Sequence, residues 1–587
     1  MNFISLIILL VLAALSPRAC ASSNICPLLG PIFPPVDHPL ESTVFSNAIA
    51  HLNATFRELD RNGTFEELNT TLFVQAFSAS DTVFQHGYAP PAMKSFLTSG
   101  TLNENTVFRV GSVSKLLTVY TLLSEVGMKH MDDPVTKWVP ELARAAKKNI
   151  GGIARRVQWN EVTIGQLAGH LAGVSRNYGL FDLESLLETA HIDPGTWGLP
   201  ILDDKERPRC SISDPALGPC SRKAFFQGIT AANSFPITSI GNTPVYSNLA
   251  YQILAYALEE MTGKSFEKSF RSSLLSPLSM NRTTLECPKD KENAVIPEND
   301  LLSWWNITTG DASVYGGMFS TAADLTRLGQ SILKSSVLEP SITRSWLKPI
   351  AHTADLEMSV GMPWEIRRTH LPLGRHSTRV VDLYTKNGAL GLYTAIIALS
   401  PDHKIGFVGL FAGPGRNSLL SYLPDLLAET LLTACEDVAR EKAASMFTGT
   451  FRGPKTQLMV RMEDTLVVRN WTQGDVNVLD TQADVQYPGL NVTISMRLYP
   501  MGLEGNGISS FRGVFEAELV NESEDEVSGT HTGPFSQTCL SWGGMDSLTY
   551  GSVGFDDFEF GIDESGAVTS LRPRVIRETL SKVREDK

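Results

Sequence analysis

The sequence predicts an α+β protein, in which an antiparallel sheet is combined with helices, followed by a separate all-β, barrel-like domain. Two observations lead to this prediction. Up to about residue 440, segments with apolar residues at helical spacing are interspersed with runs of strand-forming residues. Beyond about residue 445, apolar and polar residues mostly alternate, as in strands. A chain of 587 residues is also too long for one ordinary core, so we expect two or three domains.

The composition is that of a soluble globular protein, with 42% hydrophobic and 19% charged residues. The formal net charge is −13, and no dense run of lysine or arginine occurs. Because phosphate binding relies on clustered basic residues, we expect no nucleic-acid partner.

The first 21 residues have the pattern of a cleaved secretory signal. An apolar run over residues 3–15 precedes the small-residue site Ala19-Cys20-Ala21. The run is shorter than the ~20 residues that cross a bilayer. Because no Lys or Arg precedes it, an uncleaved anchor is the alternative. We predict a signal peptide at residues 1–21, a secreted protein and no membrane span.

Glycosylation and cysteine patterns indicate the same secretory route. Six cysteines remain after signal removal, an even number that suits an oxidising compartment. Cys210 and Cys220 lie close together in a Pro-rich loop and are predicted to form a disulfide, whereas the other pairings cannot be deduced. Eight Asn-x-Ser/Thr sequons are candidate glycosylation sites: Asn53, Asn62, Asn69, Asn281, Asn306, Asn470, Asn491 and Asn521.

The first domain is predicted to span residues 22–442. The segment NLAYQILAYALEEMTG, from Asn248, has helical apolar spacing and a glycine stop, and GGMFSTAADLTRLGQSIL predicts a turn followed by a helix. From Thr378 on, TRVVDLYTK, LGLYTAIIALS and KIGFVGLF predict consecutive antiparallel strands. Residues 176–242, rich in Pro, Asp and Ser, are predicted to form an irregular insertion, and loops of that length are often functional.

The second domain is predicted to span residues 445–587, beyond a helix that ends near Lys442. Its segment TQLMVRMEDTLVVRNW alternates with the period of a strand, and FEFGIDESGAVTSLRP predicts a hairpin. We expect an all-β domain.

A candidate nucleophile lies in FRVGSVSKLLTVYTLL, where Ser112 and Lys115 form a Ser-x-x-Lys motif. In a helix, a three-residue offset places both side chains on one face. Burial lowers a lysine pKa, so the amine could act as a base for the hydroxyl. The motif alone is weak, because matches also begin at Ser265, Ser331 and Ser345. A lysine that snorkels from a core helix is the alternative.

Two further motifs follow in order. TPVYSNLAYQIL contains Tyr246 and Asn248 in the chain's one Tyr-x-Asn, where a turn meets a helix, and YTKNGALGLY contains Lys386 and Gly388 at the end of a strand. Taken singly, they could be a half-buried tyrosine and a solvated strand-edge lysine.

The ordered set Ser-x-x-Lys, Tyr-x-Asn and Lys-x-Gly resembles the serine β-lactamase and penicillin-binding-protein superfamily, specifically its class C β-lactamase and D-aminopeptidase or esterase branch. The F-R-x-G before Ser-Val-Ser-Lys and the segments TIGQLAGHLAGV and GGMFSTAADL are also similar to that branch. The resemblance covers residues 73–432 and implies a sheet flanked by helices plus a helical subdomain. The C-terminal tail is similar to the lipocalin-like β domain of some relatives.

The resemblance implies that Ser112 is the acylated nucleophile and that Lys115 and Tyr246 share the general-base and proton-shuttle work. Asn248 would orient the substrate amide and Lys115.

The resemblance also implies that the Lys-x-Gly motif, with Lys386 and Gly388, takes part in substrate binding. Lys386 would add positive field for a carboxylate and for the tyrosine, and the strand at Gly388, over residues 389–391, would offer an oxyanion donor beside the Ser112 N–H. This chain departs from the pattern at Asn387, where Ser or Thr is common, which makes β-lactam recognition doubtful. Ala172 also replaces a frequent serine, with little expected effect.

These observations predict a secreted serine hydrolase that acts through an acyl-enzyme on an ester, amide or thioester, with a small-molecule acyl substrate and no cofactor. Acyl transfer or cyclisation on the same site and a non-catalytic binding protein are the alternatives. No Gly-x-Ser-x-Gly elbow of an α/β-hydrolase and no His-Glu-x-x-His occurs. His170 stands alone among helix residues and is expected to be structural.

Overall fold

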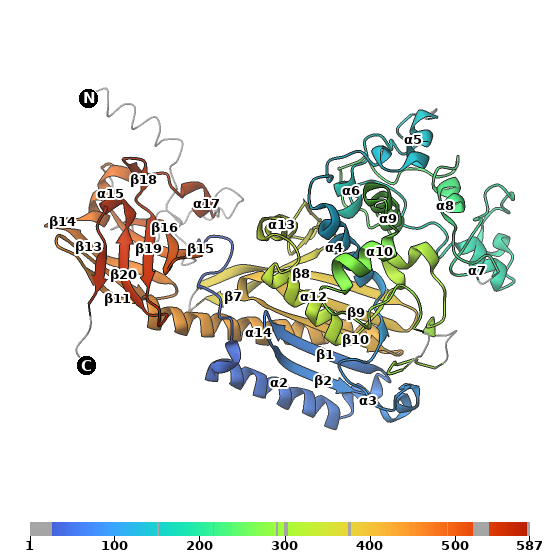
Figure 1. Ribbon diagram of the computed structural model, residues 1–587, viewed down its shortest axis with the longest axis horizontal. Coiled ribbons are helices and arrows are strands. Elements are labelled where there is room, and N and C mark those ends of the chain that lie inside the picture. Colours follow the sequence, from blue (N-terminus) through green and yellow to red (C-terminus); the bar gives the residue numbers. More distant parts are fainter. Residues whose placement is uncertain are drawn as a thin grey trace. The chain divides into compact units, whose positions relative to one another are not determined.

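A computed structural model describes residues 26–148, 152–214, 216–288, 292–298, 303–373, 377–489, 491–519 and 539–583. The predicted signal peptide and the sequon at Asn521 lie outside these ranges. The chain divides into two compact units, each described by itself below (Figure 1). The larger unit comprises Ser46–Thr369 and Asp382–Leu431, and the smaller unit comprises Met1–Phe45, His370–Val381 and Leu432–Lys587.

The larger unit is built on an eight-stranded antiparallel sheet with the order β2-β1-β10-β9-β8-β7-β6-β5. Its strands are β1 (Thr71–Ser78), β2 (Thr82–Tyr88), β5 (Ala351–His352), β6 (Met358–Val360), β7 (Glu365–Leu373), β8 (Ser377–Leu390), β9 (Tyr393–Ser400) and β10 (Ile405–Ala412). The consecutive antiparallel strands predicted from Thr378 on are β8, β9 and β10. A short second sheet pairs β3 (Phe108–Arg109) with β4 (Phe319–Ser320).

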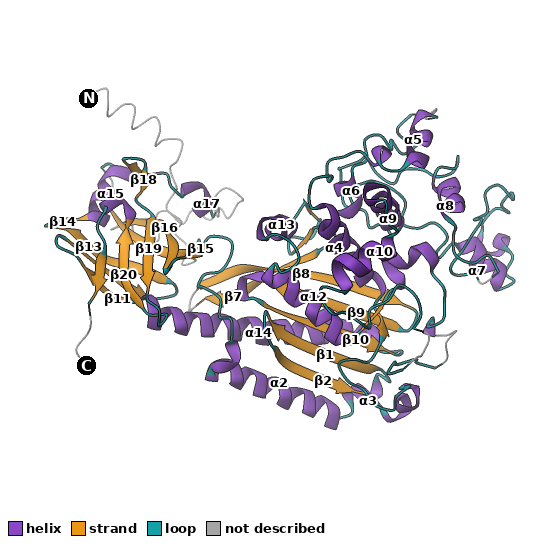
Figure 2. Cartoon of the chain, viewed as in Figure 1, coloured by secondary structure: helices purple, strands orange, loops and turns teal. Residues whose placement is uncertain are grey.

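Helices cover both faces of the large sheet (Figure 2). The central strands β1, β9 and β10 are therefore buried along their whole length, and they read as apolar runs rather than alternating patterns. The helices are α2 (Thr43–Arg61), α3 (Thr64–Glu67), α4 (Ser114–Val126), α5 (Pro140–Lys147), α6 (Ile164–Ala168), α7 (Leu183–Thr189), α8 (Arg222–Ile229), α9 (Leu249–Thr262), α10 (Phe266–Phe270), α12 (Ala322–Lys334), α13 (Pro340–Trp346) and α14 (Arg416–Phe447).

Helices α4 and α9 form the centre of the helical subdomain, and ten residues of each are buried. A surface helix usually has apolar residues on one face only. These two helices are apolar on nearly all faces, and they therefore pack against other elements on every side. The glycine stop predicted for α9 is Gly263, whose left-handed φ of 67° ends the helix. The predicted α+β architecture is confirmed.

The insertion at residues 176–242 is more regular than its composition predicts. It contains α7 and α8, which are capped by the side chains of Asp182 and Ser221. Helices this short show too few turns for a period to stand out in the sequence. A disulfide joins Cys210 to Cys220 in the same segment.

The smaller unit contains a nine-stranded sheet with the order β12-β11-β21-β20-β19-β16-β15-β13-β14. An additional β12–β13 pairing closes eight of these strands into an antiparallel barrel, which confirms the predicted barrel-like domain. The strands are β11 (Gly449–Arg452), β12 (Thr456–Met462), β13 (Leu466–Gln473), β14 (Val476–Asn477), β15 (Val492–Gly505), β16 (Ile508–Leu519), β19 (Asp557–Ile562), β20 (Val568–Pro573) and β21 (Leu580–Lys582). The other elements are α15 (Val478–Gln486), α17 (Ser541–Gly544), β17 (Thr549–Tyr550) and β18 (Val553–Gly554).

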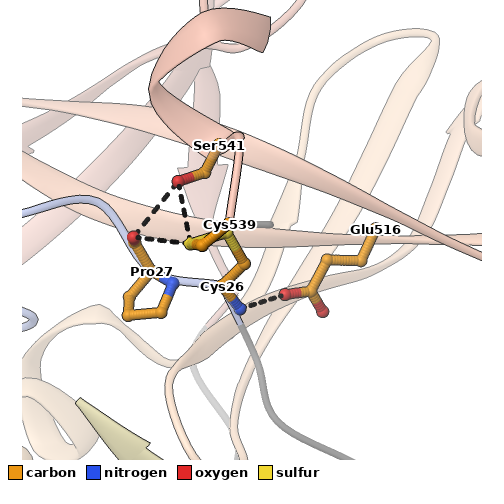
Figure 3. Close-up of a disulfide and its surroundings, with 5 residues drawn as sticks. All are labelled: Cys26, Pro27, Glu516, Cys539 and Ser541. Carbon is orange, nitrogen blue, oxygen red and sulfur yellow. Dashed lines mark hydrogen bonds between the residues drawn. A yellow bond between two sulfur atoms is a disulfide. The ribbon is translucent and has the colours of Figure 1, made fainter. Parts of the chain in front are cut away.

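The N-terminal segment belongs to the smaller unit, where Ile32 and Phe33 are buried in the barrel's apolar cluster. A disulfide joins Cys26 to Cys539, and Figure 3 shows its surroundings. The Cys26 N–H donates to Glu516 Oε1 at 3.4 Å. Since 513 residues separate the two cysteines, no local pattern could have predicted this pair.

The described ranges contain no helix with the length and apolarity needed to span a bilayer. The two disulfides suit a chain that matures in an oxidising compartment. Among the sequon asparagines in these ranges, Asn53 is half-buried and the following are exposed: Asn62, Asn69, Asn281, Asn306, Asn470 and Asn491.

Candidate active site

Ser112 lies in a 3-10 turn, Gly111–Val113, that connects β3 to α4. Gly111 has a left-handed φ of 52°, which a glycine adopts without steric cost. The turn places Ser112 at the start of a buried helix while leaving the residue itself half-buried. A serine in this position is held rigidly and can still be reached from solvent.

Lys115, one turn further along α4, is completely buried. Its ammonium donates to Ser112 Oγ at 3.0 Å and to the backbone carbonyl of Tyr315 at 2.6 Å. The sequence contains four Ser-x-x-Lys matches, but within the described residues only this lysine ammonium reaches its serine hydroxyl. The first of the four matches is therefore the one with the geometry of an activated serine.

Burial lowers the pKa of Lys115 to about 8, because the apolar core disfavours the ammonium form. The neighbouring Tyr246 acts in the opposite direction by attracting the positive charge, and the second cation, Lys386, lowers the pKa further. A lysine poised this close to neutrality can exchange a proton with a serine hydroxyl.

Tyr246 brings a second titrating group to the same place. The Nζ atoms of Lys115 and Lys386 lie 4.9 Å and 5.3 Å from its ring centroid. Burial opposes the phenolate, but the two ammonium charges and hydrogen bonding with Lys115 and Ser112 outweigh it and lower the tyrosine pKa to about 8. The three motifs thus meet in space, although they are far apart in the sequence.

Lys386 is almost fully buried and paired with Glu365, which lies at the start of β7. Its ammonium donates to a Glu365 oxygen and, at 2.8 Å, to the Asn387 carbonyl. Burial would lower the pKa of Lys386, but the charges of Glu365 and Tyr246 outweigh burial and raise it. Lys386 therefore remains a cation. Glu365 could not be predicted from the sequence, because no spacing rule links it to the Lys-x-Gly motif.

Strand β8 lies directly against the turn that carries Ser112. A Cβ atom added at Gly388 would lie 2.0 Å from the Val110 carbonyl oxygen and 2.7 Å from the Ser112 nitrogen. From the other side, a Cβ at Gly111 would lie 2.4 Å from the Ala389 nitrogen. Two glycines therefore allow two backbones to approach where a side chain would separate them.

We expect Gly388→Ala to be damaging, because its Cβ would meet fixed backbone atoms. The strand would move away from Ser112, and we expect kcat/KM on an activated ester to fall about 100-fold and the free energy of unfolding to fall by about 1–3 kcal/mol. Gly505→Ala is the matched control, since Gly505 is also in a strand but has no atom within 4 Å of an added Cβ. Wild-type activity in Gly388→Ala would contradict this close approach.

Asn248 is the N-cap residue of α9. Its side-chain amide donates to Asn177 Oδ1 at 2.6 Å, and its backbone N–H donates to the Arg176 carbonyl at 2.8 Å. In the described part of the chain, no hydrogen bond joins Asn248 to Lys115. Its expected role toward the substrate amide and the lysine stays a prediction.

His170 contacts the site through Tyr246. The two rings stack with centroids 4.5 Å apart and an interplanar angle of 24°. The Ser247 N–H donates to His170 Nδ1 at 3.1 Å. Burial and the nearby cations, Lys115 first among them, hold the His170 pKa well below its usual value. A neutral imidazole that supports the tyrosine ring agrees with the structural role expected from the sequence.

Comparisons with known proteins identify a family for this chain. A family model described as "Beta-lactamase" matches residues 79–432, more than half of the chain. The chain belongs to the beta-lactamase family. A second model, described as "Beta-lactamase-like-like, C-terminal domain", matches residues 439–584. The resemblance inferred from the three ordered motifs is thereby confirmed.

Relatives match between two thirds and four fifths of the chain. A "Beta-lactamase-like protein" of Arthroderma benhamiae is 27% identical over 508 residues, which cover 81% of each chain. A protein of Phoma sp. named as a probable hydrolase is 27% identical over 401 residues, covering 66% of this chain and 62% of its own. A solved class C beta-lactamase mutant has 17% identity and a TM-score of 0.45, covering 66% of this chain and 98% of its own.

In the ranges that the structure describes, no three or more His, Cys, Asp or Glu side chains are grouped so that they could hold a metal ion.

Proposed function

We propose that this member of the beta-lactamase family is a secreted serine hydrolase that forms an acyl-enzyme on Ser112. The observation that carries the proposal is the 3.0 Å contact between the Ser112 hydroxyl and Lys115, a completely buried lysine whose pKa is lowered to about 8. The substrates would be esters, amides or thioesters of small molecules.

In acylation, Ser112 Oγ attacks the substrate carbonyl carbon while its proton passes to the Lys115–Tyr246 pair. The carbonyl π bond becomes an oxyanion, for which the Ser112 N–H and the β8 backbone near Ala389 are candidate donors. Collapse of this intermediate breaks the bond to the leaving group, and the pair returns the proton to that group. Water then attacks the acyl carbon on Ser112 and gives a proton to the same pair. The bond from that carbon to Ser112 Oγ breaks, the pair returns the proton to Oγ, and the acid is released.

Lys386 supports this chemistry as a second cation near the Tyr246 ring. Since its ion pair with Glu365 keeps it protonated, it favours the tyrosine's anionic form and can attract a negatively charged substrate group. The next residue is Asn387, an amide where relatives commonly have a hydroxyl. Its Oδ1 is buried and has no hydrogen-bond partner among the described residues. This supports a substrate other than a β-lactam.

The secretory route is part of the proposal. It is supported by the two disulfides and by the six exposed sequon asparagines. Release of glycans from the expressed protein by an amidase, read as a mass decrease, tests it.

Intact mass after exposure to a fluorophosphonate tests the nucleophile. We expect one adduct, located on Ser112 by peptide mapping. Labelling should be slower when an ester that the protein hydrolyses is present and competes for the same serine. Adding an alcohol or amine acceptor to the ester reaction separates hydrolysis from acyl transfer, because transfer yields a new ester or amide. A folded protein that takes no adduct would overturn the proposal and favour a binding protein.

The pH profile should report the Lys115–Tyr246 pair. Both pKa values are about 8, and the pair must have lost a proton to accept one from Ser112. We therefore expect kcat/KM to rise about tenfold per pH unit below pH 8 and to level off above it. Tyr246 raises the pKa of Lys115, so in Tyr246→Phe the rise should shift to lower pH while the plateau falls.

The exposed Tyr422 provides the control, because Tyr422→Phe should leave the profile unchanged. A wild-type rate that is flat between pH 6 and pH 9 would contradict the assignment of this pair as the base.

A further inference from the structure

Two aromatic side chains, Phe181 and Trp304, stack on each other in the larger unit although they are far apart in the sequence. Their ring centroids lie 5.6 Å apart with an interplanar angle of 29°. Phe181 is 56% exposed, an unusual state for a phenylalanine, and Trp304 is half-buried. The catalytic roles assigned above use neither ring.

Both residues have left-handed backbone conformations, with φ of 55° at Phe181 and 65° at Trp304. Aromatic residues rarely adopt this region, and doing so costs on the order of 1–3 kcal/mol. Such residues cluster at binding sites, where the surrounding structure holds them in place. Two such residues stacked on each other suggest that the position of their rings serves binding.

Trp304 lies beside the end of β8, the strand that packs on Ser112. A Cβ at Gly391 would lie 2.7 Å from the Trp304 Cβ. Gly391 follows Gly388 by three residues, a path of about 10 Å at the usual rise of a strand. Trp305, which follows Trp304 in the sequence, is anchored through its backbone carbonyl, which accepts a hydrogen bond from Arg109 Nη2 at 2.7 Å. Arg109 lies two residues before the turn that holds the nucleophile.

Phe181 approaches from the insertion. Asn177, four residues before Phe181, accepts a hydrogen bond from the side chain of Asn248 at the candidate site. The Phe181 N–H donates to Ser213 Oγ at 3.0 Å, and the Gly179 carbonyl accepts from the Ile212 N–H at 2.7 Å. Ser213 lies between the two cysteines of the Cys210–Cys220 disulfide. Two hydrogen bonds therefore attach the segment that carries the Phe181 ring to the loop closed by the disulfide.

We propose that Phe181 and Trp304 form a subsite that binds an aromatic ring or a similarly flat apolar group of the substrate. The proposal rests on the function proposed above and adds a substrate class to it. A ring more than half exposed, stacked on a residue that lies beside the end of β8, can stack on one further ring at little additional ordering cost. The preferred substrates are esters or thioesters that carry an aryl or arylmethyl group on either the acyl or the leaving side.

Thioesters test both sides with one readout, because the released thiol is measured by a disulfide reagent. The rate on the S-ethyl thioester of phenylacetic acid, compared with that on S-ethyl thioacetate, tests the acyl side. The rate on S-benzyl thioacetate, compared with that on S-ethyl thioacetate, tests the leaving side. We expect the wild-type protein to prefer the aromatic member in one of these pairs. In Trp304→Ala and in Phe181→Ala this preference in kcat/KM should fall about 3- to 10-fold.

Trp197→Ala is the matched control, since Trp197 is an aromatic residue of the same insertion and is 59% exposed. It should keep the wild-type preference. Trp197→Ala should also keep the fluorophosphonate labelling rate and the rate on S-ethyl thioacetate. Trp304→Phe should retain part of the preference.

The outcomes separate the two proposals. A lost preference on the acyl side or on the leaving side supports the subsite and assigns the aromatic group to that side. Normal labelling with unchanged ratios in both pairs overturns the aromatic subsite alone. A wild-type protein that is not labelled overturns the serine hydrolase and the subsite with it.

Discussion

Ser112→Ala is expected to lower kcat/KM on an activated ester by on the order of 10⁴- to 10⁶-fold. The hydroxyl is the group that forms the covalent bond, and Lys115 beside it is a base with nothing to activate once the hydroxyl is absent. The variant should also lose the fluorophosphonate adduct. Its unfolding temperature should change little, because Ser112 is half-buried and alanine fits the same turn.

A second Ser-x-x-Lys sequence in the same unit provides the control. Ser345 and Lys348 have the same spacing, but both are exposed. Ser345→Ala should keep wild-type activity and labelling. A Ser112→Ala protein that still turns over the ester, or still takes the adduct, would disprove the acyl-enzyme at Ser112.

Lys115→Met is expected to lower kcat/KM by about 10²- to 10⁴-fold, with the free energy of unfolding at pH 7 unchanged within about 1 kcal/mol or increased. The pKa of Lys115 is about 8 in the folded protein and 10.5 ordinarily. Between these values the unfolded chain binds more protons, so stability rises with pH. Below pH 8 the lysine therefore carries the full cost of burial, which methionine of similar length removes.

Urea unfolding at pH 7 and at pH 9.5, together with kcat/KM, measures both parts of this prediction. The stability of Lys115→Met relative to the wild-type protein should fall at the higher pH, because only the wild type gains stability above pH 8. Lys348→Met, at an exposed lysine, should leave activity and stability unchanged. A Lys115→Met protein that is strongly destabilised but as active as the wild type would indicate a structural lysine instead.

A large part of the fold follows from local patterns. The three strands after Thr378 and the β19–β20 hairpin of the smaller unit are predicted by short-range patterns, which depend only on neighbouring residues. Ser112 and Lys115 could also be paired from sequence, because a helix fixes the geometry of residues three apart. Tyr246 and Lys386 could be added only through the family resemblance.

Contacts between distant residues could not be predicted from such patterns. Glu365 on β7 forms an ion pair with Lys386 on β8. Cys26 forms a disulfide with Cys539, which is 513 residues away in the sequence. Two short helices in the insertion were also missed, since their few turns show no clear period.

By itself, the sequence determined the helix that presents Ser112 beside Lys115 and the order of the three motifs, because these depend on spacing along one backbone. Only the tertiary structure decided the lowered pKa of Lys115, the approach of Gly388 to the Ser112 turn and the stacking of Phe181 on Trp304. Each of these depends on burial or on close packing between segments far apart in the chain, and packing at that distance leaves no period in the sequence.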